Sequence, residues 1–156
     1  MGLASYRALF FRPVFLLSVG WLIGSAFAGG TLDAPSYPLV LSSHISTRGQ
    51  TASGSTLITL NHDLPCTLVF SVAQPGDEVL HNGSATLLTA YKFTGAGLQN
   101  ADTNWVDSSS FLGRVYDLPG FGPVDQMTLS AQGTAPSNTA PEAGTYTASL
   151  ILTVSW

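Results

Sequence analysis

Basic side chains are scarce in this chain, and their scarcity excludes one large class of partners. The 156 residues include five Lys and Arg in total, and beyond residue 28 only Arg48, Lys92 and Arg114 remain, against nine acidic residues. The formal net charge of residues 29–156 is therefore −6. Three scattered cations form no basic patch, so we do not expect nucleic-acid binding.

Cysteine is limited to Cys66, which excludes a disulfide within the chain. Two roles remain for this thiol: a small buried hydrophobic side chain, or a reactive group that pairs between molecules. Its neighbours Leu64-Pro65 and Thr67 to Phe70 are typical of a strand. The flanking pattern therefore favours the buried role.

Helical periodicity is also missing. No stretch of the chain repeats apolar residues at the 3.6-residue spacing of an amphipathic helix. Charged residues make up 9% of the chain, while Thr, Ser, Gly and Ala are plentiful. This composition is typical of extracellular β-structure with short polar turns rather than of a cytosolic enzyme.

Residues 1–28 have the order of a secretory signal peptide. Arg7 and Arg12 form a basic start, residues 13–24 form an apolar stretch, and residues 25–28 form a small-x-small cleavage site. We therefore expect export and cleavage at this site.

A membrane anchor is the alternative interpretation of the same segment. A spanning helix needs about 20 uninterrupted apolar residues, and Arg12 interrupts this run. We therefore favour cleavage, which leaves a single domain of residues 29–156 without a membrane segment.

The last thirteen residues have the clearest periodicity in the chain. Between Gly144 and Trp156, apolar and aromatic side chains alternate with Thr and Ser, and Ile151 is the exception. Because successive side chains of a strand point to opposite faces, this pattern predicts a half-buried strand that runs to the chain terminus. Its apolar face consists of Tyr146, Ala148, Leu150, Leu152, Val154 and Trp156.

Other short segments with strand character lie between turn signals. His81-Asn82-Gly83-Ser84 predicts a tight hairpin turn, because Asn-Gly accepts the positive φ angles of such turns. Gln74 to Glu78 predicts another turn, and the polar residues 95–109 predict a loop. Together these features predict an all-β, immunoglobulin-like β-sandwich. Its seven predicted strands are Pro38–Ser46, Thr56–Leu60, Thr67–Ala73, Thr86–Thr94, Phe111–Tyr116, Gln126–Ala131 and Gly144–Trp156.

The residues that carry chemistry form no recognisable active site. His44, His62 and His81 lie far apart in the sequence and have no metal-ligand spacing. His62-Asp63 could join one of many serines in a hydrolase triad, but the chain has no Gly-x-Ser-x-Gly turn. We therefore expect no catalytic residues, no metal and no cofactor, and we do not expect an enzyme.

Two motifs have both a structural and a functional interpretation. Asn82-Gly83-Ser84 matches a glycosylation sequon, although the hairpin turn explains it without modification. Trp105 lies in the polar loop, where it could stack on a sugar or pack back against the sandwich. Trp105 therefore keeps carbohydrate binding open as a function.

The segment Pro141 to Trp156 reads Pro-Glu-Ala-Gly-Thr-Tyr-Thr-Ala-Ser-Leu-Ile-Leu-Thr-Val-Ser-Trp. It resembles the closing strand of the spore coat protein U domain family, which includes the pilins of archaic chaperone–usher pili. Chains of that family commonly finish with Ala-Gly-Thr-Tyr, alternating Val and Thr, and an aromatic end. The cysteine pair usual in the family has no counterpart here. Similar β-patterns extend the resemblance over residues 53–156, at Thr56–Leu60, Pro65–Val72 and Thr86–Phe93.

The resemblance implies a sandwich that is one strand short and exposes an apolar groove beside its last strand. In the family, a periplasmic chaperone fills the groove first. The N-terminal extension of the next subunit then replaces the chaperone at the outer-membrane usher. The implied groove residues are Tyr146, Leu150, Leu152, Val154 and Trp156. The implied donor segment is residues 29–45, with the apolar side chains Leu32, Leu39, Leu41 and Ile45.

The sequence and the resemblance together predict a structural subunit of a surface pilus or coat, completed by a donor strand. Its expected partners are a periplasmic chaperone, an outer-membrane usher and other pilus subunits. We expect it in the periplasm during transit and then at the cell surface or outside the cell. The alternative is a secreted adhesive or carbohydrate-binding module, such as one at a pilus tip.

Overall fold

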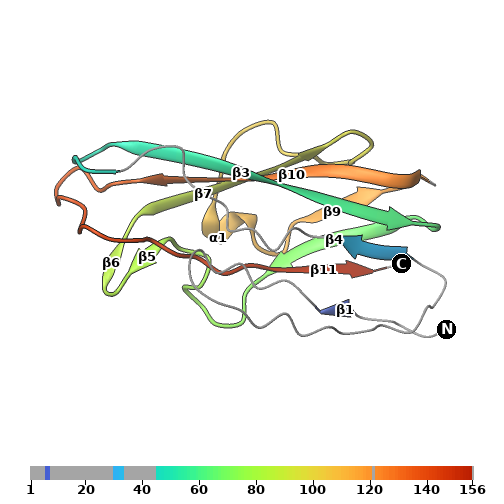
Figure 1. Ribbon diagram of the computed structural model, residues 1–156, viewed down its shortest axis with the longest axis horizontal. Helices are drawn as coiled ribbons and strands as arrows, with labels where there is room; N and C mark the ends of the chain where they lie inside the picture. The colour runs from blue at the N-terminus through green and yellow to red at the C-terminus, as the bar shows by residue number, and fades with distance from the viewer. Residues whose placement is uncertain (1–5, 8–29, 34–44, 121, 156) are drawn as a thin grey trace.

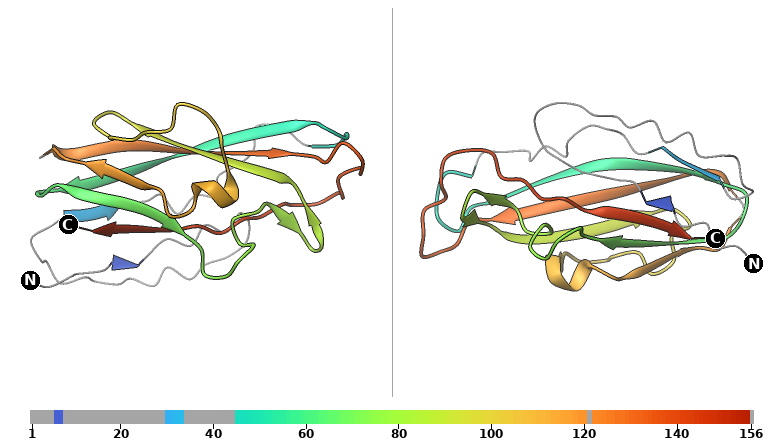
Figure 2. Two further views of the ribbon diagram at one scale, coloured as in Figure 1. Left: turned by 180° about the vertical axis from the view of Figure 1, so that it is seen from behind. Right: turned by 90° about the horizontal axis from the view of Figure 1, so that it is seen from below.

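The computed structural model describes residues 6–7, 30–33, 45–120 and 122–155, which form two layers of antiparallel sheet (Figure 1). One sheet has the strand order β1-β11-β4-β9, and the other has the order β2-β3-β10-β7-β8. Two further views show the layers from behind and from below (Figure 2). The prediction of an all-β sandwich is confirmed.

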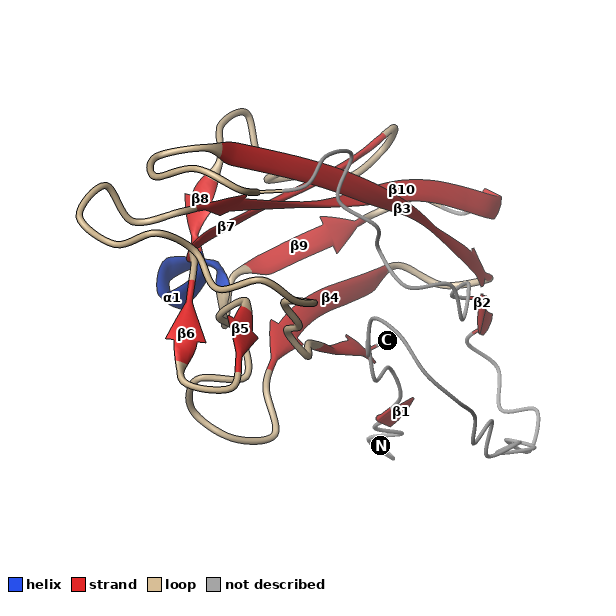
Figure 3. Cartoon of the chain, turned by 60° about the vertical axis from the view of Figure 1, so that its left-hand side comes forward, coloured by secondary structure: helices blue, strands red, loops and turns tan. Residues whose placement is uncertain are grey.

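The two sheets are built from strands of very different length. The first sheet contains β1 (Tyr6–Arg7), β4 (Cys66–Ser71), β9 (Val115–Leu118) and β11 (Ile151–Ser155). The second contains β2 (Gly30–Asp33), β3 (Thr51–His62), β7 (Leu88–Gly95), β8 (Val106–Asp107) and β10 (Gly122–Thr134). A hairpin of β5 (His81–Asn82) and β6 (Ala85–Thr86) and the short helix α1 (Ser108–Phe111) complete the described elements (Figure 3).

The core lies between the sheets and follows the period of two expected of half-buried strands. Every second side chain of β4 is buried, including Leu68 and Phe70, and the end of β3 alternates in the same way at Ile58, Leu60 and His62. An aromatic cluster occupies the middle of this core. Its ring centroids lie 5.0–5.1 Å apart in the pairs Phe70–Phe93, Phe70–Phe111, Tyr91–Phe111 and Phe93–Tyr116. Each such pair stabilises the fold by about 0.5–1.5 kcal/mol beyond its buried area.

Both predicted turns form. The Asp77 N–H donates to the Gln74 carbonyl and the Val79 N–H to the Gly76 carbonyl, which closes the first turn. In the hairpin, His81 pairs with Thr86 and Asn82 with Ala85. The turn residues are thus Gly83, with φ of 59°, and Ser84, while Asn82 itself belongs to β5.

Three strand predictions need correction. Thr86–Thr94 is divided at Leu87 between β6 and β7. The predicted strand Phe111–Tyr116 is wrong at its start, because Phe111 ends α1 with its ring buried in the core and β9 begins at Val115. Gly113, with φ of 74°, makes the turn between them. Of the predicted strand Pro38–Ser46, residues 38–44 lie outside the described residues, and Ile45 and Ser46 are not in a strand.

The last strand is also shorter than predicted. It spans Ile151–Ser155 instead of beginning at Gly144. The preceding residues face β5 and the turn before it: Thr147 forms an isolated bridge with His81 of β5, and the Ser149 N–H donates to the Asp77 carbonyl in the turn. A turn offers no continuous row of backbone partners, so this part does not form a regular strand.

Candidate functional site

The last strand, β11, lies near one end of its sheet, and this position makes its outer side the candidate site. On one side β11 pairs with β4 over its whole length, from Ile151 opposite Ser71 to Ser155 opposite Thr67. On the other side, the only described partner is β1, in which Tyr6 pairs with Val154 and Arg7 with Thr153 (Figure 1). We call this outer side of residues 151–155 the β11 edge.

Backbone geometry shows which groups point out of the β11 edge. The Gly113 N–H donates to the Phe70 carbonyl, so the backbone groups of Phe70 face β9. Phe70 is opposite Leu152 in the pairing with β11. Opposite residues in an antiparallel ladder exchange both hydrogen bonds or neither, so the N–H and carbonyl of Leu152 face away from β4. Val154, two residues further on, faces the same way.

The side chains of the same residues point into the core. Leu150, Leu152 and Val154 are only 3%, 1% and 2% exposed and belong to the main core cluster. Ile151 and Thr153, on the opposite face, are half-buried. A strand added at the β11 edge would therefore form backbone hydrogen bonds with Leu152 and Val154. It would direct every second side chain toward the core.

The other two predicted groove residues do not join this row in the described structure. Tyr146 is half-buried and packs against a separate small cluster formed by Leu80, Leu87 and Ala135. Its hydroxyl accepts a hydrogen bond from the Glu142 N–H at 2.9 Å. Trp156 lies outside the described residues. The candidate site therefore rests on Leu150, Leu152 and Val154.

The predicted donor residues fall in different places. Leu32 lies in β2, where it pairs with Leu60 of β3 in the other sheet. Ile45 packs against the Leu80 cluster. Leu39 and Leu41 lie outside the described residues. The two described donor residues thus contact their own domain, Leu32 through β3 and Ile45 through the cluster that Tyr146 also contacts.

The opposite end of the same sheet is covered differently. There β9 is the last strand, and Gln99 from the loop between β7 and β8 pairs with its Asp117. The Gln99 N–H donates to the Asp117 carbonyl at 2.7 Å, and the Asp117 N–H donates back at 3.3 Å. A local segment therefore satisfies part of the β9 edge.

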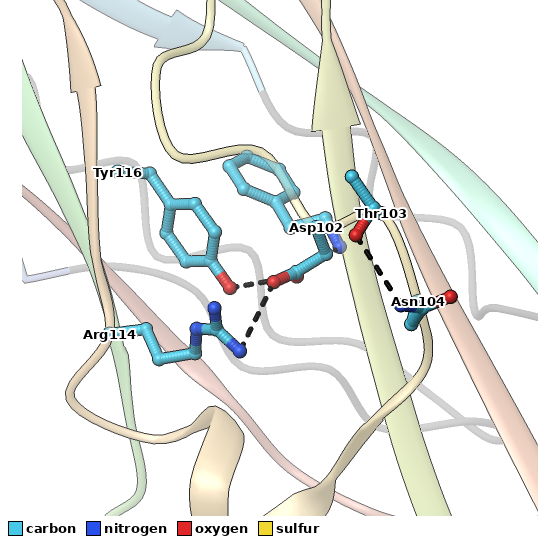
Figure 4. A network of polar contacts seen from close by, with 6 residues as sticks. Asp102, Thr103, Asn104, Arg114 and Tyr116 are labelled. Carbon is cyan, nitrogen blue, oxygen red and sulfur yellow. Dashed lines mark hydrogen bonds and ion pairs between the residues drawn. The ribbon is translucent and has the colours of Figure 1, made fainter.

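A buried carboxylate, Asp102, holds this covering loop in place (Figure 4). Its Oδ2 accepts hydrogen bonds from the Phe93 N–H of β7 at 2.8 Å and from the Tyr116 hydroxyl of β9 at 2.9 Å. Its Oδ1 lies 3.4 Å from a guanidinium nitrogen of Arg114. Because β7 and β9 belong to different sheets, Asp102 connects the two layers.

The sequence gives no signal for this network. Asp102 stands in a polar, glycine-containing loop with no periodic neighbours, and such residues are mostly solvent-exposed. Burial and the bond to Asp102 raise the pKa of Tyr116, so its hydroxyl stays a donor at neutral pH. The network contacts only backbone, Tyr116 and Arg114, so we interpret it as structural.

The histidine considered for a hydrolase triad is also structural. His62 pairs with Asp125 of β10 at 2.5 Å through Nε2, while its Nδ1 lies 2.7 Å from the Leu64 carbonyl. Burial alone would lower the pKa of His62, but the hydrogen bonds to Asp125 and Leu64 outweigh it and raise the pKa. Both ring nitrogens are therefore engaged, and neither is available as a general base.

The Cys66 thiol is also a structural group, and the described residues offer no metal site. Cys66 is buried, as predicted, and burial together with the Asp125 charge raises the pKa of its thiol to about 11. The thiol is therefore protonated and unreactive at neutral pH. Among the described residues, no group of three or more His, Cys, Asp or Glu side chains could hold a metal ion.

The sequon residue Asn82 and the loop residue Trp105 lie in different environments. The Asn82 amide donates to the Ala143 carbonyl at 3.3 Å and lies against Gly144, so the sequon asparagine is used to hold a neighbouring loop. Trp105 is 40% exposed, immediately before β8. Trp105 thus remains open to an external partner, whereas Asn82 is occupied.

No family model, curated protein or solved structure matches this chain. Within the described ranges, the structure contains no helix with the length and hydrophobicity needed to cross a bilayer.

Proposed function

We propose that this protein is an exported structural subunit of a surface pilus or coat, assembled by the addition of a partner strand at the β11 edge. The observation that carries the proposal is the position of β11. Its described outer partner is β1, and β1 lies inside the predicted signal peptide. Removal of residues 1–28 would therefore take that partner away.

The energetics of such an edge favour a partner strand. The N–H and carbonyl groups of Leu152 and Val154 point along the sheet, and an edge of this kind pairs readily with another chain. The side chains beneath them are core residues, each of which stabilises the fold by about 1.5–3 kcal/mol when buried. A partner strand would satisfy the backbone groups and keep water away from these side chains.

Strand addition also explains the partners that the resemblance implies. A periplasmic chaperone would occupy the β11 edge after export, and another subunit would replace it at an outer-membrane usher. Main-chain hydrogen bonds would supply affinity, and alternate apolar side chains would set the register. The low charge and the scarcity of basic residues are compatible with a protein that assembles through backbone pairing.

The donor from each subunit is proposed to be residues 29–45. In the structure, Gly30–Asp33 of this segment pairs with β3 of its own domain. Donation to a neighbour would therefore require β2 to leave β3 and give up four residue pairs, Gly30↔His62 to Asp33↔Thr59. Assembly would then be an exchange of one β-pairing for another.

The test compares two substitutions on opposite faces of β11. Leu152→Asp places an unpaired charge in the core, whereas Thr153→Asp changes the other face. We expect Leu152→Asp to abolish co-purification with the chaperone and surface assembly, and Thr153→Asp to retain both. Removal of Trp156 should weaken capture, because Trp156 is one of the groove residues that the resemblance implies. Equal capture of Leu152→Asp and the unsubstituted protein would contradict the proposal.

Export has a separate test. We expect protein recovered from outside the cytoplasm to begin at or near Gly29, which N-terminal sequencing would show. A retained Met1 in a membrane fraction would contradict cleavage.

The exposed indole of Trp105 favours a second candidate, a secreted carbohydrate-binding or adhesive module. An exposed aromatic ring can stack on a sugar, and Trp105 is 40% exposed. Glycan binding by the isolated domain that is lost in Trp105→Ala would support this candidate. If the domain binds no glycan but is captured by the chaperone, only the proposal of a structural subunit is supported.

A further inference from the structure

The exposed indole of Trp105 lies at the edge of the sheet that contains β7, one residue before β8 (Figure 3). Opposite residues in an antiparallel pair share a face of the sheet. Val106 of β8 is opposite the buried Tyr91 of β7, so both point to the core. The alternation of side chains then directs Trp105 and Lys92 to the outer face, where they are neighbours on adjacent strands.

The surroundings of Lys92 on this outer face are polar and largely uncharged. Ser130 of β10 is directly opposite Lys92, and Thr128 and Gln132 lie on the same face of β10 on either side of Ser130. Asp107 of β8 stands diagonally across from Lys92. In the part of the chain that the structure describes, Lys92 forms no ion pair. Its ammonium group is therefore available to an external anion.

We propose that Trp105 and Lys92 form a binding site for an acidic polysaccharide, in which the indole stacks on a sugar ring and the ammonium binds the carboxylate of a uronic acid. The inference rests on the second candidate function, a carbohydrate-binding module, and names its site and its class of sugar. The site lies on the sheet that does not contain β11, so strand addition at the β11 edge would leave it accessible.

The spacing of the two groups suits a sugar that carries a carboxylate. Neighbouring strands lie about 4.8 Å apart, so a ring stacked on Trp105 places its substituents over Lys92. The Ser130 hydroxyl and the Gln132 amide can donate to and accept from the sugar hydroxyls beside it. A sheet face is flat, whereas sites for single small molecules are concave. The face therefore fits an extended polymer better than a free monosaccharide.

Charge favours an acidic polymer over a neutral one. Residues 29–156 have a formal net charge of −6, which repels a polyanion, so binding one requires a local cation. Beyond residue 28 the basic residues are Arg48, Lys92 and Arg114. Arg114 is paired with Asp102, and Arg48 lies in the turn before β3. Lys92 is the cation that adjoins the exposed indole, and a neutral sugar would leave it without an anionic partner.

The test measures binding of the exported protein, recovered with any subunit bound to it, to polygalacturonate and to its methyl ester. The ester has the same sugar chain without the charge. We expect the acid to bind about fivefold more tightly than the ester, the upper end for an exposed ion pair. Lys92→Gln should remove this preference. Arg48→Gln is the matched control, because it removes the same charge from the turn before β3 and should keep the preference.

Trp105→Ala should weaken binding of both polymers by about tenfold, because stacking on the ring serves both. Each variant is compared on two polymers, so a loss of folding cannot imitate a loss of preference alone. Equal binding of acid and ester by the unsubstituted protein would overturn the acidic site, even if Trp105→Ala still abolished binding and so supported a carbohydrate module. Equal loss of preference in Lys92→Gln and Arg48→Gln would assign it to net charge and also overturn the site.

Failure to bind either polymer would contradict both the site and its Trp105 stacking platform. It would leave the structural subunit untouched, because capture by the chaperone is measured separately and involves the other sheet.

Discussion

The two edges of the sheet that contains β11 are covered by different kinds of segment. At the β9 end, Gln99 comes from the loop between β7 and β8 and exchanges two backbone hydrogen bonds with Asp117. The Asn100 amide adds a third contact, to the Asp117 carboxylate at 3.2 Å. At the β11 end, the described cover is two residues from near the start of the chain. The β9 edge is therefore covered by a segment close to it in sequence, and the β11 edge by a segment far from it in sequence.

The difference has an energetic consequence. The chain between Tyr6 and Val154 is roughly eight times as long as the chain between Gln99 and Asp117, which adds about 2 kcal/mol to the entropic cost of closing it. The β9 cover is also fixed by the Asp102 network, which has no counterpart among the described contacts of β1. We therefore expect the β9 edge to stay closed and the β11 edge to open.

The largest expected effect distinguishes the two faces of β11. Leu152→Ala removes a side chain that is 1% exposed and should lower the free energy of unfolding by about 2–5 kcal/mol. Thr153→Ala, on the half-buried outer face, should cost less than about 1 kcal/mol. Urea unfolding of both variants measures the difference. Equal losses would mean that β11 does not present Leu152 to the core.

The next largest effect is expected from Asp102→Ala, which should loosen the cover of the β9 edge. Asp102→Ala leaves the Phe93 N–H and the Tyr116 hydroxyl without their buried acceptor, at a cost of roughly 2–3 kcal/mol. The loop that carries Gln99 should loosen, so that the Asp117 amide exchanges faster with solvent.

Arg114→Ala provides the control for Asp102→Ala. It removes a partner of the same carboxylate, but the Arg114 side chain is 42% exposed, so its loss should cost about 1 kcal/mol or less. If Arg114→Ala loosened the loop as much as Asp102→Ala does, the buried hydrogen bonds would not be the cause.

The sequence predicted the parts of the fold that follow a simple period. The alternation of Leu150, Leu152 and Val154 predicted their common face, and all three are buried. The same alternation continues back to Tyr146, yet β11 begins only at Ile151. The neighbouring chain from Gln74 to Val79 forms turns instead of a strand, and no local pattern within residues 144–150 could reveal that.

The candidate site was predictable only in part. Period two identified the inward face of β11, but the place of a strand within a sheet depends on contacts between residues far apart in sequence. The covers of the two edges, Gln99 and β1, therefore had no signal in their local sequences. Asp102 and the His62–Asp125 pair were missed for the same reason, since each depends on a partner from another strand.

A smaller effect depends on pH and concerns the other sheet. The pKa of folded His62 lies above the ordinary value of 6.5, so the folded state holds this proton more tightly than the unfolded state does. The resulting stabilisation is fully present below about pH 6.5 and is lost as the pH rises through the raised pKa. Thermal unfolding across this range measures it. His62→Phe should remove this pH dependence, and an unchanged dependence would assign it to another group.

The smallest effect is expected on the outer face of β9. Val115 is 50% exposed, so Val115→Lys should change the free energy of unfolding by no more than about 0.5 kcal/mol. A charge on an edge strand also discourages pairing with another chain. Chemical unfolding and light scattering of this variant would check both points. A large loss of stability would show that β9 is covered by more than the Gln99 loop.

The most direct test of the central claim is the behaviour of residues 29–156 without and with a partner strand. Without one, we predict poor solubility or exchange of strands between molecules, because the β11 edge is left open. With a donor strand grafted after the C-terminus, we predict a monomer that unfolds cooperatively. Light scattering and denaturant unfolding of the two proteins decide the matter. A monomeric, cooperatively folding domain of residues 29–156 without any added strand would contradict the account.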